Sequence, residues 1–187
     1  MKKLVLLGDS IRLIGYGTQV PELLKDEFNT WQPEDNGRFS KYTLRYVSYE
    51  WVPQIEGADV IHWNNGLWDV NDLGDGVFTS PDEYVENMTR IARRLLEMGK
   101  KVIFATTTPV KEDHAHHSNA RIAAYNARLV PQLQSMGILI NDLYSLVYPN
   151  RETFIREDLV HLSEAGIEAC ARQTVQCIRE AAGFLGK

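Results

Sequence analysis

The sequence contains few cysteines. Only Cys170 and Cys177 occur among the 187 residues, and they lie seven positions apart in a segment with helical periodicity. Two helical turns separate such residues by roughly 10 Å along the axis, whereas a disulfide needs Cα atoms within about 7 Å. We therefore expect both thiols to be reduced and buried, as is typical of a cytoplasmic protein.

Long apolar runs are also absent. No stretch approaches the roughly 18–20 apolar residues that cross a membrane. Met1 is followed by two lysines and the apolar run Leu4–Leu7, which resembles the start of a signal peptide. This run ends at Gly8-Asp9, before the roughly 7–15 residues of a signal-peptide core are reached. We expect no membrane partner, and we interpret the run as a buried first strand.

Positive charge is not in excess. The chain has 20 Lys+Arg against 25 Asp+Glu, a formal net charge of −5, and no run of basic residues. A nucleic-acid partner is therefore not expected, because such proteins carry a basic patch. The chain is 44% hydrophobic, 10% aromatic and 24% charged, which is enough apolar material for a packed core. We predict a single domain over residues 1–187.

The hydrophobic pattern alternates short apolar runs with helical segments, which predicts a parallel sheet covered by helices on both faces. Several of the runs are continuous rather than alternating, as expected of strands buried on both sides. The predicted strands are Lys3–Leu7, Glu27–Trp31, Ala58–Trp63, Lys101–Ala105 and Gly137–Ile140.

Three long helices have recognisable starts. One begins at the capping box Ser80-Pro81-Asp82-Glu83 and ends at Gly99. The second is capped by Ser118 or Asn119, and Pro131 inside it should kink or divide it. The last begins at Ser163 and has an apolar stripe that extends to Leu185. Shorter helices are expected after Ser10 and around residues 42–51.

The residues that follow the predicted strands are candidates for chemistry, since open parallel sheets bind ligands beyond the carboxyl ends of their strands. The first strand leads to Gly8-Asp9-Ser10-Ile11, the third to Asn64-Asn65-Gly66-Leu67-Trp68-Asp69 and the fourth to Thr106-Thr107-Thr108-Pro109. The segment Asp158-Leu159-Val160-His161 directly precedes the final helix.

Ser10 is well placed to be a nucleophile. It opens a helix, where backbone N–H groups can stabilise an oxyanion, and it follows a glycine that permits a tight turn. A serine hydroxyl also needs a base, and the base needs an orienting acceptor. His161 and Asp158 supply both, because side chains three positions apart can meet on one helical turn.

These motifs resemble those of the SGNH/GDSL hydrolases, a family of serine esterases and acylhydrolases. Gly8-Asp9-Ser10-Ile11 matches the first block of the family and Asp158-x-x-His161 matches the last, so the resemblance covers nearly the whole chain. It implies a three-layer α/β/α fold with a flavodoxin-like, mostly parallel five-stranded sheet. It also implies Ser10 as nucleophile, His161 as general base and Asp158 as its orienting group, without metal or organic cofactor.

The two middle blocks depart from the family pattern. The family places an oxyanion glycine after the second strand, where this chain has Ser40 or Lys41, with Gly37 shortly before them. We favour the Ser40 backbone N–H as donor, alongside the Ser10 N–H.

In the third block, Trp68 stands where the family has an asparagine. Asn64, at the end of the strand, can present an amide to the same space. Successive strand residues face opposite sides, so only one of Asn64 and Asn65 faces the site, and we favour Asn64 as the third oxyanion donor. The alternative is that both asparagines only form the turn.

Other side chains invite functional interpretations. The run from His114 to His117 contains His-x-His but no complete metal-ligand set, so we interpret it as a solvated loop at the rim of the site. We expect Arg12 to be a helix-surface residue, although it could bind an anionic substrate, and His62 to be a satisfied buried histidine. Trp51 and Trp63 should be core or wall residues, whereas Trp68 lies beside the predicted site.

The leading hypothesis is a serine esterase acting on a small acyl ester, above all an acetyl ester on carbohydrate. The chain has no long insertion that could form a lid or a lipid tunnel. The second hypothesis is a non-catalytic ligand-binding module on the same scaffold, motivated by the two irregular blocks. A metal-dependent phosphoesterase using Asp9, Asn64 and the His114–His117 loop is the third. The oligomeric state stays open.

Overall fold

The computed structural model, which describes residues 1–184, contains a five-stranded sheet of order β2-β1-β3-β4-β5. All of its strand pairs are parallel. This is the flavodoxin-like order that the resemblance implied. Every predicted strand is present, with ends shifted by two residues or fewer: β1 (Lys2–Leu7), β2 (Phe28–Trp31), β3 (Val60–Asn64), β4 (Val102–Ala105) and β5 (Leu139–Asn141).

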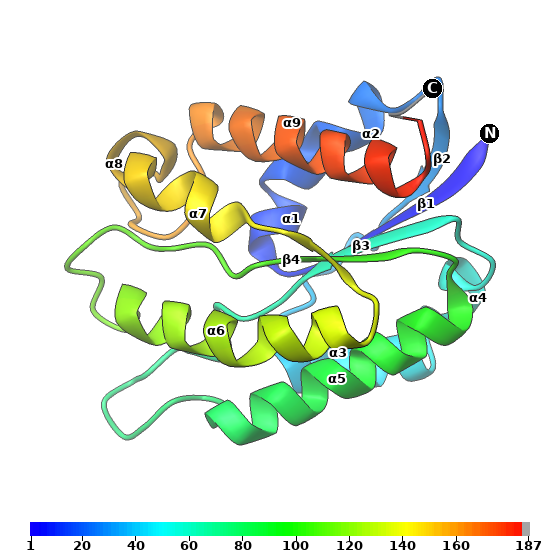
Figure 1. The fold of residues 1–187 in the computed structure, drawn as a ribbon. Coiled ribbons are helices and arrows are strands. Elements are labelled where there is room, and N and C mark those ends of the chain that lie inside the picture. Colours follow the sequence, from blue (N-terminus) through cyan, green and yellow to red (C-terminus); the bar gives the residue numbers. More distant parts are fainter. Residues whose placement is uncertain (185–187) are drawn as a thin grey trace.

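Helices cover both faces of the sheet, which confirms the three-layer α/β/α architecture (Figure 1). One layer contains α1 (Ser10–Leu13), α2 (Val20–Leu23), α7 (Leu143–Val147), α8 (Arg151–Phe154) and α9 (Glu164–Ala181), with the 3-10 turns η1 (Tyr16–Thr18) and η2 (Tyr148–Asn150). The other contains α3 (Ser40–Ser48), α4 (Val52–Ile55), α5 (Pro81–Met98) and α6 (Asn119–Ser135). Among residues 1–184, no helix has the length and apolar character needed to cross a membrane.

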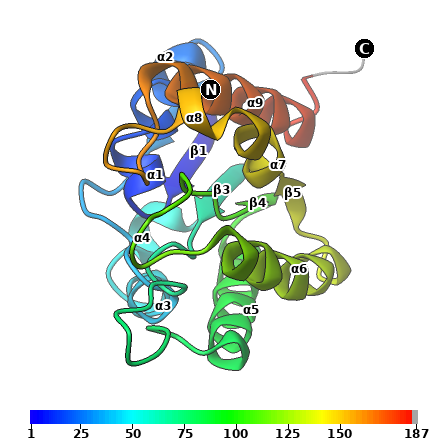
Figure 2. The same ribbon diagram turned by 90° about the vertical axis from the view of Figure 1, so that its left-hand side faces the viewer.

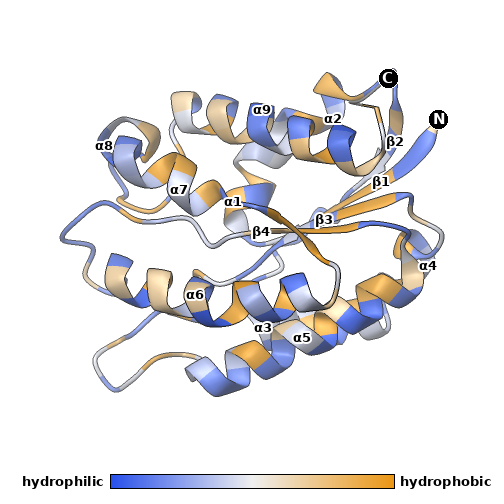
Figure 3. Cartoon of the chain, viewed as in Figure 1, coloured by the Kyte–Doolittle hydropathy of each residue, from blue (hydrophilic) through white to orange (hydrophobic). Residues whose placement is uncertain are grey.

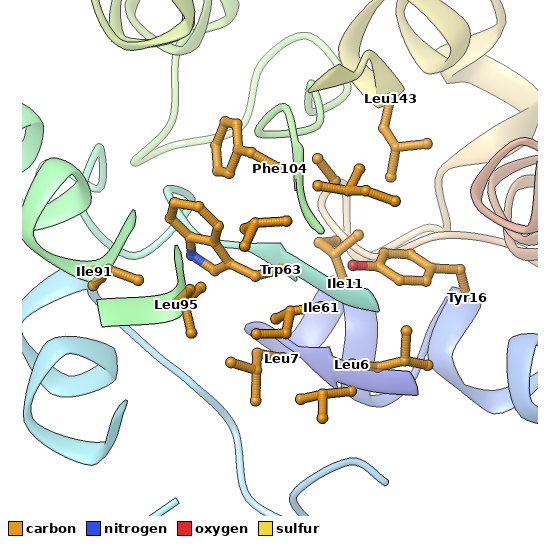
Figure 4. Close-up of a cluster of buried hydrophobic side chains, with 14 of the residues drawn as sticks. Leu6, Leu7, Ile11, Tyr16, Ile61, Trp63, Ile91, Leu95, Phe104 and Leu143 are labelled. Atoms are coloured by element: carbon orange, nitrogen blue, oxygen red, sulfur yellow. The ribbon is translucent and has the colours of Figure 1, made fainter. Parts of the chain in front are cut away.

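The core lies on both sides of the sheet. The strands are mostly hydrophobic in Figure 3, and all five residues of β3 are buried. Figure 4 shows the side chains of β1, β3 and β4 packed against helices from both layers. Trp63 and Trp51 are buried, as predicted. Cys170 is buried and Cys177 partly buried, and neither forms a disulfide.

The helix ends follow the predicted caps. The hydroxyls of Ser80, Ser118 and Ser163 each accept a backbone N–H in the first turn of α5, α6 and α9. Of the two effects predicted for Pro131, the division of the helix is wrong, whereas the kink stays a prediction. Pro131 does not divide α6, which continues from Asn119 to Ser135. Pro131 is exposed whereas Leu129 and Leu133 are fully buried. Water can therefore donate a hydrogen bond to the backbone carbonyl that has no helical N–H partner because of Pro131, while the opposite face of α6 packs against the core. Leu185 lies outside the described residues.

The carboxyl ends of the strands meet at one edge of the sheet, which lies on the left in Figure 1 and faces the viewer in Figure 2. The turn after β1 leads there into α1, and β3 ends beside it at Asn64. The segment 155–162, which precedes α9, reaches the same edge. The fold thereby gathers the candidate residues from distant parts of the chain.

Candidate active site

Three predicted residues meet at this edge. The Ser10 Oγ is 3.0 Å from His161 Nε2, although the two residues are 151 positions apart in the chain. The other ring nitrogen, His161 Nδ1, is 2.9 Å from Asp158 Oδ2. With a proton on Nδ1, the imidazole donates to the carboxylate and presents an accepting Nε2 to the serine hydroxyl. This is the arrangement of a nucleophile, a base and an orienting carboxylate.

The turn that carries Ser10 is built by its two preceding residues. Gly8 has a φ of +154°, and a Cβ there would collide with the side chain of Asn64. Asp9 caps α1, because its Oδ1 accepts the N–H of Ile11 at 2.9 Å. Ser10 therefore occupies the first position of α1, with its N–H directed outward from the helix start. No partner for this N–H is found in residues 1–184.

The Asp158 carboxylate shapes its own loop. Its Oδ1 accepts the N–H groups of Val160 and His161 at 3.0 and 2.9 Å, while Oδ2 holds the imidazole. Between them, Leu159 adopts a φ of +70°, an unusual conformation for a residue with a branched side chain. Burial would raise the pKa of Asp158, but these three hydrogen bonds outweigh it and lower the pKa below its usual value. The carboxylate is therefore ionised at neutral pH.

An open cleft of about 380 Å³ lies over Ser10 and His161. Among residues 1–184, no Lys, Arg, Asp or Glu belongs to its lining, which consists of Ser10, Asn36, Leu67, Trp68, Asn71, His117, Val160 and His161. A larger hollow of about 510 Å³ between α2 and α9 is lined by Leu23, Arg172, Val175, Gln176 and Arg179 and contains no nucleophile. The smaller cleft is therefore the candidate active site.

The Ser40 backbone N–H is not free to bind an oxyanion, in contrast to the prediction. It donates to both oxygens of Asp69, at 3.1 and 2.9 Å, and the Ser40 hydroxyl also donates to Asp69 at 2.6 Å. Gly37, an alternative, donates its N–H to Gly8 O. Lys41 is the remaining candidate, since its N–H has no partner within the described residues. Burial raises the pKa of Asp69 to about 6.

The two asparagines of the third block have different surroundings. Asn65 is fully buried, and its side chain binds the indole N–H of Trp63 and the carbonyl of Arg38. Asn64 packs against Gly8, and its Nδ2 donates to Asp9 Oδ1 at 2.8 Å. One N–H of the Asn64 amide is therefore committed, and the second has no partner in residues 1–184.

Arg12 differs from its prediction as a surface residue. It is 1% exposed, and its guanidinium donates to the carbonyls of Pro33 and Asp35 at 2.8 Å. It also lies 3.3 Å from Gly8 O. Arg12 therefore fixes the loop that carries Asn36 and is not exposed to an anionic substrate. The sequence could not show this, since the helix α1 has only four residues and the partners lie beyond β2.

The histidines divide between core and rim. His62 is fully buried, with Nε2 3.0 Å from Asn141 Nδ2, and burial lowers its pKa to about 3. Its Nδ1 has no hydrogen-bond partner within residues 1–184, so the histidine predicted to be satisfied is satisfied at one nitrogen only. His117 lines the cleft, where its Nε2 is 2.9 Å from Leu67 O and burial lowers its pKa to about 4. The His114–His117 loop thus contributes one neutral side chain to the site. In residues 1–184, no three His, Cys, Asp or Glu side chains gather as metal ligands would.

Comparison with known proteins gives structural matches only. No family model and no curated protein sequence matches the chain. A lipase/acylhydrolase from Enterococcus faecalis superposes with a TM-score of 0.82 at 22% identity, over 100% of this chain and 98% of the other. An acetylxylan esterase from Geobacillus stearothermophilus gives 0.77 at 20% identity, over 98% and 94% of the chains. A member of the lipolytic protein G-D-S-L family from Veillonella parvula gives 0.77 at 14% identity, over 94% and 97%. The chain has the SGNH/GDSL hydrolase fold.

Within this SGNH/GDSL fold, the site contains residues that the sequence did not single out. Asp69 anchors Ser40, Tyr16 binds Asn64, and Asn36 and Asn71 line the cleft. Tyr16 follows Ser10 by six positions, but nothing in that spacing indicates a contact with β3. Asp69 ends the irregular third block, which was the only available signal that its side chain belongs to the site.

Proposed function

We propose that the chain is a serine esterase or acylhydrolase that cleaves small acyl esters through an acyl-enzyme. The observation that carries this proposal is the continuous hydrogen-bond chain from Ser10 through His161 to Asp158 at the floor of an open cleft. The SGNH/GDSL fold supports it, because the structural neighbours include a lipase/acylhydrolase and acetylxylan esterases.

The mechanism follows from the positions of these groups. Ser10 Oγ attacks the ester carbonyl while His161 Nε2 accepts its proton, and Asp158 stabilises the imidazolium that forms. His161 then protonates the departing alcohol, and water hydrolyses the acyl-enzyme with the same base. The N–H of Ser10 and the uncommitted N–H of Asn64 are the proposed oxyanion donors, each worth roughly 3–4 kcal/mol of barrier. No step requires a metal or an organic cofactor.

The cleft favours a small, uncharged acyl ester. Within residues 1–184 its lining offers hydrogen-bonding groups from Asn36, Asn71 and Trp68 but no Lys, Arg, Asp or Glu side chain. The indole of Trp68 is 39% exposed and provides an apolar surface beside polar groups, which suits a sugar ring. Acetylated carbohydrate is therefore the leading substrate class. The unpaired thiols of Cys170 and Cys177 support a reducing, cytoplasmic location.

Hydrolysis of p-nitrophenyl acetate in the presence of EDTA tests this function. We expect turnover that EDTA does not change, that Ser10→Ala abolishes, and that parallels labelling by a fluorophosphonate. Ser135→Ala, which removes an exposed hydroxyl on α6, is the matched control and should behave as the wild type. Turnover that survives Ser10→Ala but is lost with EDTA would instead contradict catalysis by Ser10, His161 and Asp158.

A non-catalytic ligand-binding module is the alternative. It is favoured by one observation: two of the expected oxyanion donors, the Ser40 N–H and one N–H of Asn64, are already bonded to Asp69 and Asp9. A folded wild-type protein that neither turns over the ester nor reacts with the fluorophosphonate would support this alternative.

A further inference from the structure

A buried chain of hydrogen bonds lies directly behind Ser10. The Tyr16 hydroxyl donates to Asn64 Oδ1 at 2.8 Å, and Asn64 Nδ2 donates to Asp9 Oδ1 at 2.8 Å. The same Asp9 oxygen accepts the Ile11 N–H at 2.9 Å. Tyr16 and Asp9 are fully buried and Asn64 is 4% exposed, so water does not compete for these bonds.

The donors and acceptors in this series of hydrogen bonds are compatible with only one orientation of the Asn64 amide. A tyrosine hydroxyl whose hydrogen points at Asn64 requires the amide oxygen on its side. The amide nitrogen then faces Asp9, where a donor is needed. A reversed amide would bring its oxygen against the Asp9 oxygen and leave the nitrogen facing the hydroxyl. Tyr16 and Asp9 therefore hold Asn64 from opposite sides.

Tyr16 is itself held in place by the core. Its ring meets His62 edge to face, with centroids 5.4 Å apart. In Figure 4 the ring lies among the buried side chains near Ile11, with its hydroxyl pointing into the cluster. A hydroxyl carried by so rigid a ring has little freedom to follow Asn64 if that side chain shifts. The Tyr16 hydroxyl therefore restricts the position of the Asn64 amide.

We propose that Tyr16 is a positioning residue for the reaction: acting through Asn64 and Asp9, it fixes the turn that carries Ser10 and the orientation of the Asn64 amide, the proposed oxyanion donor. This inference rests on the proposed esterase function. Tyr16 is fully buried and its hydroxyl is bonded to Asn64, so it touches neither substrate nor reacting atoms. Its effect passes through two contacts, first to Asn64 and then to the Asp9 cap of α1.

The loss of the hydroxyl should therefore slow the chemical step rather than weaken substrate binding. Tyr16→Phe leaves Asn64 Oδ1 buried without a donor, and the amide loses one of its two restraints. A small displacement of a catalytic donor has a large effect on rate, so we expect kcat to fall roughly 10- to 100-fold with KM unchanged. Asn64→Ala should lower kcat roughly 100-fold.

A double-mutant cycle on p-nitrophenyl acetate turnover tests the inference, with the fraction of active enzyme counted by fluorophosphonate labelling. If Tyr16 acts through Asn64, Tyr16→Phe/Asn64→Ala should be no slower than Asn64→Ala alone. Tyr125→Phe is the matched control, because it also removes a buried hydroxyl hydrogen bond, to Thr79 O at 2.7 Å, but away from Ser10. We expect it to lose stability to a similar extent and to keep its kcat.

Two results would overturn the inference while leaving the esterase function intact. One is a double variant whose loss equals the product of the two single losses. The other is a Tyr16→Phe enzyme that, once corrected for active fraction, turns over at the wild-type kcat. Absence of Ser10-dependent turnover in the wild type is a different result, which would overturn the proposed function together with this inference.

Discussion

The two sides of the site are built in opposite ways. The imidazole side, defined as Asp158 and His161, comes from one short loop, and these side chains are 45% and 27% exposed. The amide side, defined as Ser40 and Asn64 with their partners Asp69, Asp9 and Tyr16, is buried. Its contacts join residues 29 to 55 positions apart, such as Ser40 with Asp69 and Asn64 with Asp9.

The difference extends to the charges. On the imidazole side, hydrogen bonds outweigh burial and lower the pKa of Asp158. On the amide side, burial outweighs the hydrogen bonds and raises the pKa values of Asp9 and Asp69. The imidazole side therefore positions the catalytic groups with little effect on the free energy of unfolding. The amide side both positions residues of the site and stabilises the fold. Substitutions on the two sides should have different effects.

The largest effect on activity should come from the imidazole side. We expect His161→Ala to lower kcat roughly 10⁴- to 10⁶-fold, because Ser10 loses its base. Stability should change by less than about 1 kcal/mol, since the side chain is partly exposed and contacts only Ser10 and Asp158 through its ring nitrogens. Ester turnover and urea denaturation measure the two quantities. A variant that unfolds would contradict the separation between the sides.

A smaller effect, on stability, should come from Asp69. Burial raises its pKa to about 6 in the folded protein, whereas the unfolded chain releases this proton near its usual pKa of 3.8. The stability contributed by the protonated group is complete below that usual value and is lost as the pH rises through about 6. The wild type should therefore gain about 1 kcal/mol relative to Asp69→Asn when the pH falls from 7 to 5.

Urea denaturation of both proteins at pH 7, 6 and 5 measures this difference. Asp59 has the opposite sign, because its bond to Lys100 lowers its pKa, and stability tied to a lowered pKa is lost only as the pH falls through that lowered value, outside this window. Asp59→Asn is therefore the control and should keep a constant difference from the wild type between pH 5 and 7. A constant difference for Asp69→Asn would mean that the buried carboxyl does not titrate there.

The fold and the imidazole side were predictable because their signals are local. Apolar runs such as Leu4–Leu7 report burial directly, and serine caps such as Ser80 and Ser163 mark helix starts within one turn. Asp158 and His161 are three positions apart, so the sequence alone could pair them, although they lie in a loop with Leu159 at a φ of +70° and not on the expected helical turn. Their approach to Ser10 required only the rule that strand ends of a parallel sheet share one edge.

The amide side was not predictable from the same information. The sequence favours the Ser40 N–H as an oxyanion donor, and nothing in it indicates that this N–H donates to Asp69, 29 positions away. Arg12 looked like a surface residue because its carbonyl partners at Pro33 and Asp35 carry no sequence signal. Backbone partners of any residue type can satisfy a buried side chain, so a sequence pattern cannot name them.

The smallest expected effect comes from Trp68, which lines the cleft. Its substitution should change substrate binding and leave the chemical step unchanged. Trp68 is 39% exposed, and its indole N–H has no partner within the described residues, so Trp68→Ala should leave stability within about 0.5 kcal/mol of the wild type. For an acetylated sugar it should raise KM about 5-fold, which corresponds to about 1 kcal/mol, with kcat unchanged. Tyr148→Ala, at 38% exposure but outside the cleft, is the matched control and should alter neither constant. A fall in kcat would instead place the Trp68 indole N–H among the oxyanion donors and extend the amide side to the rim.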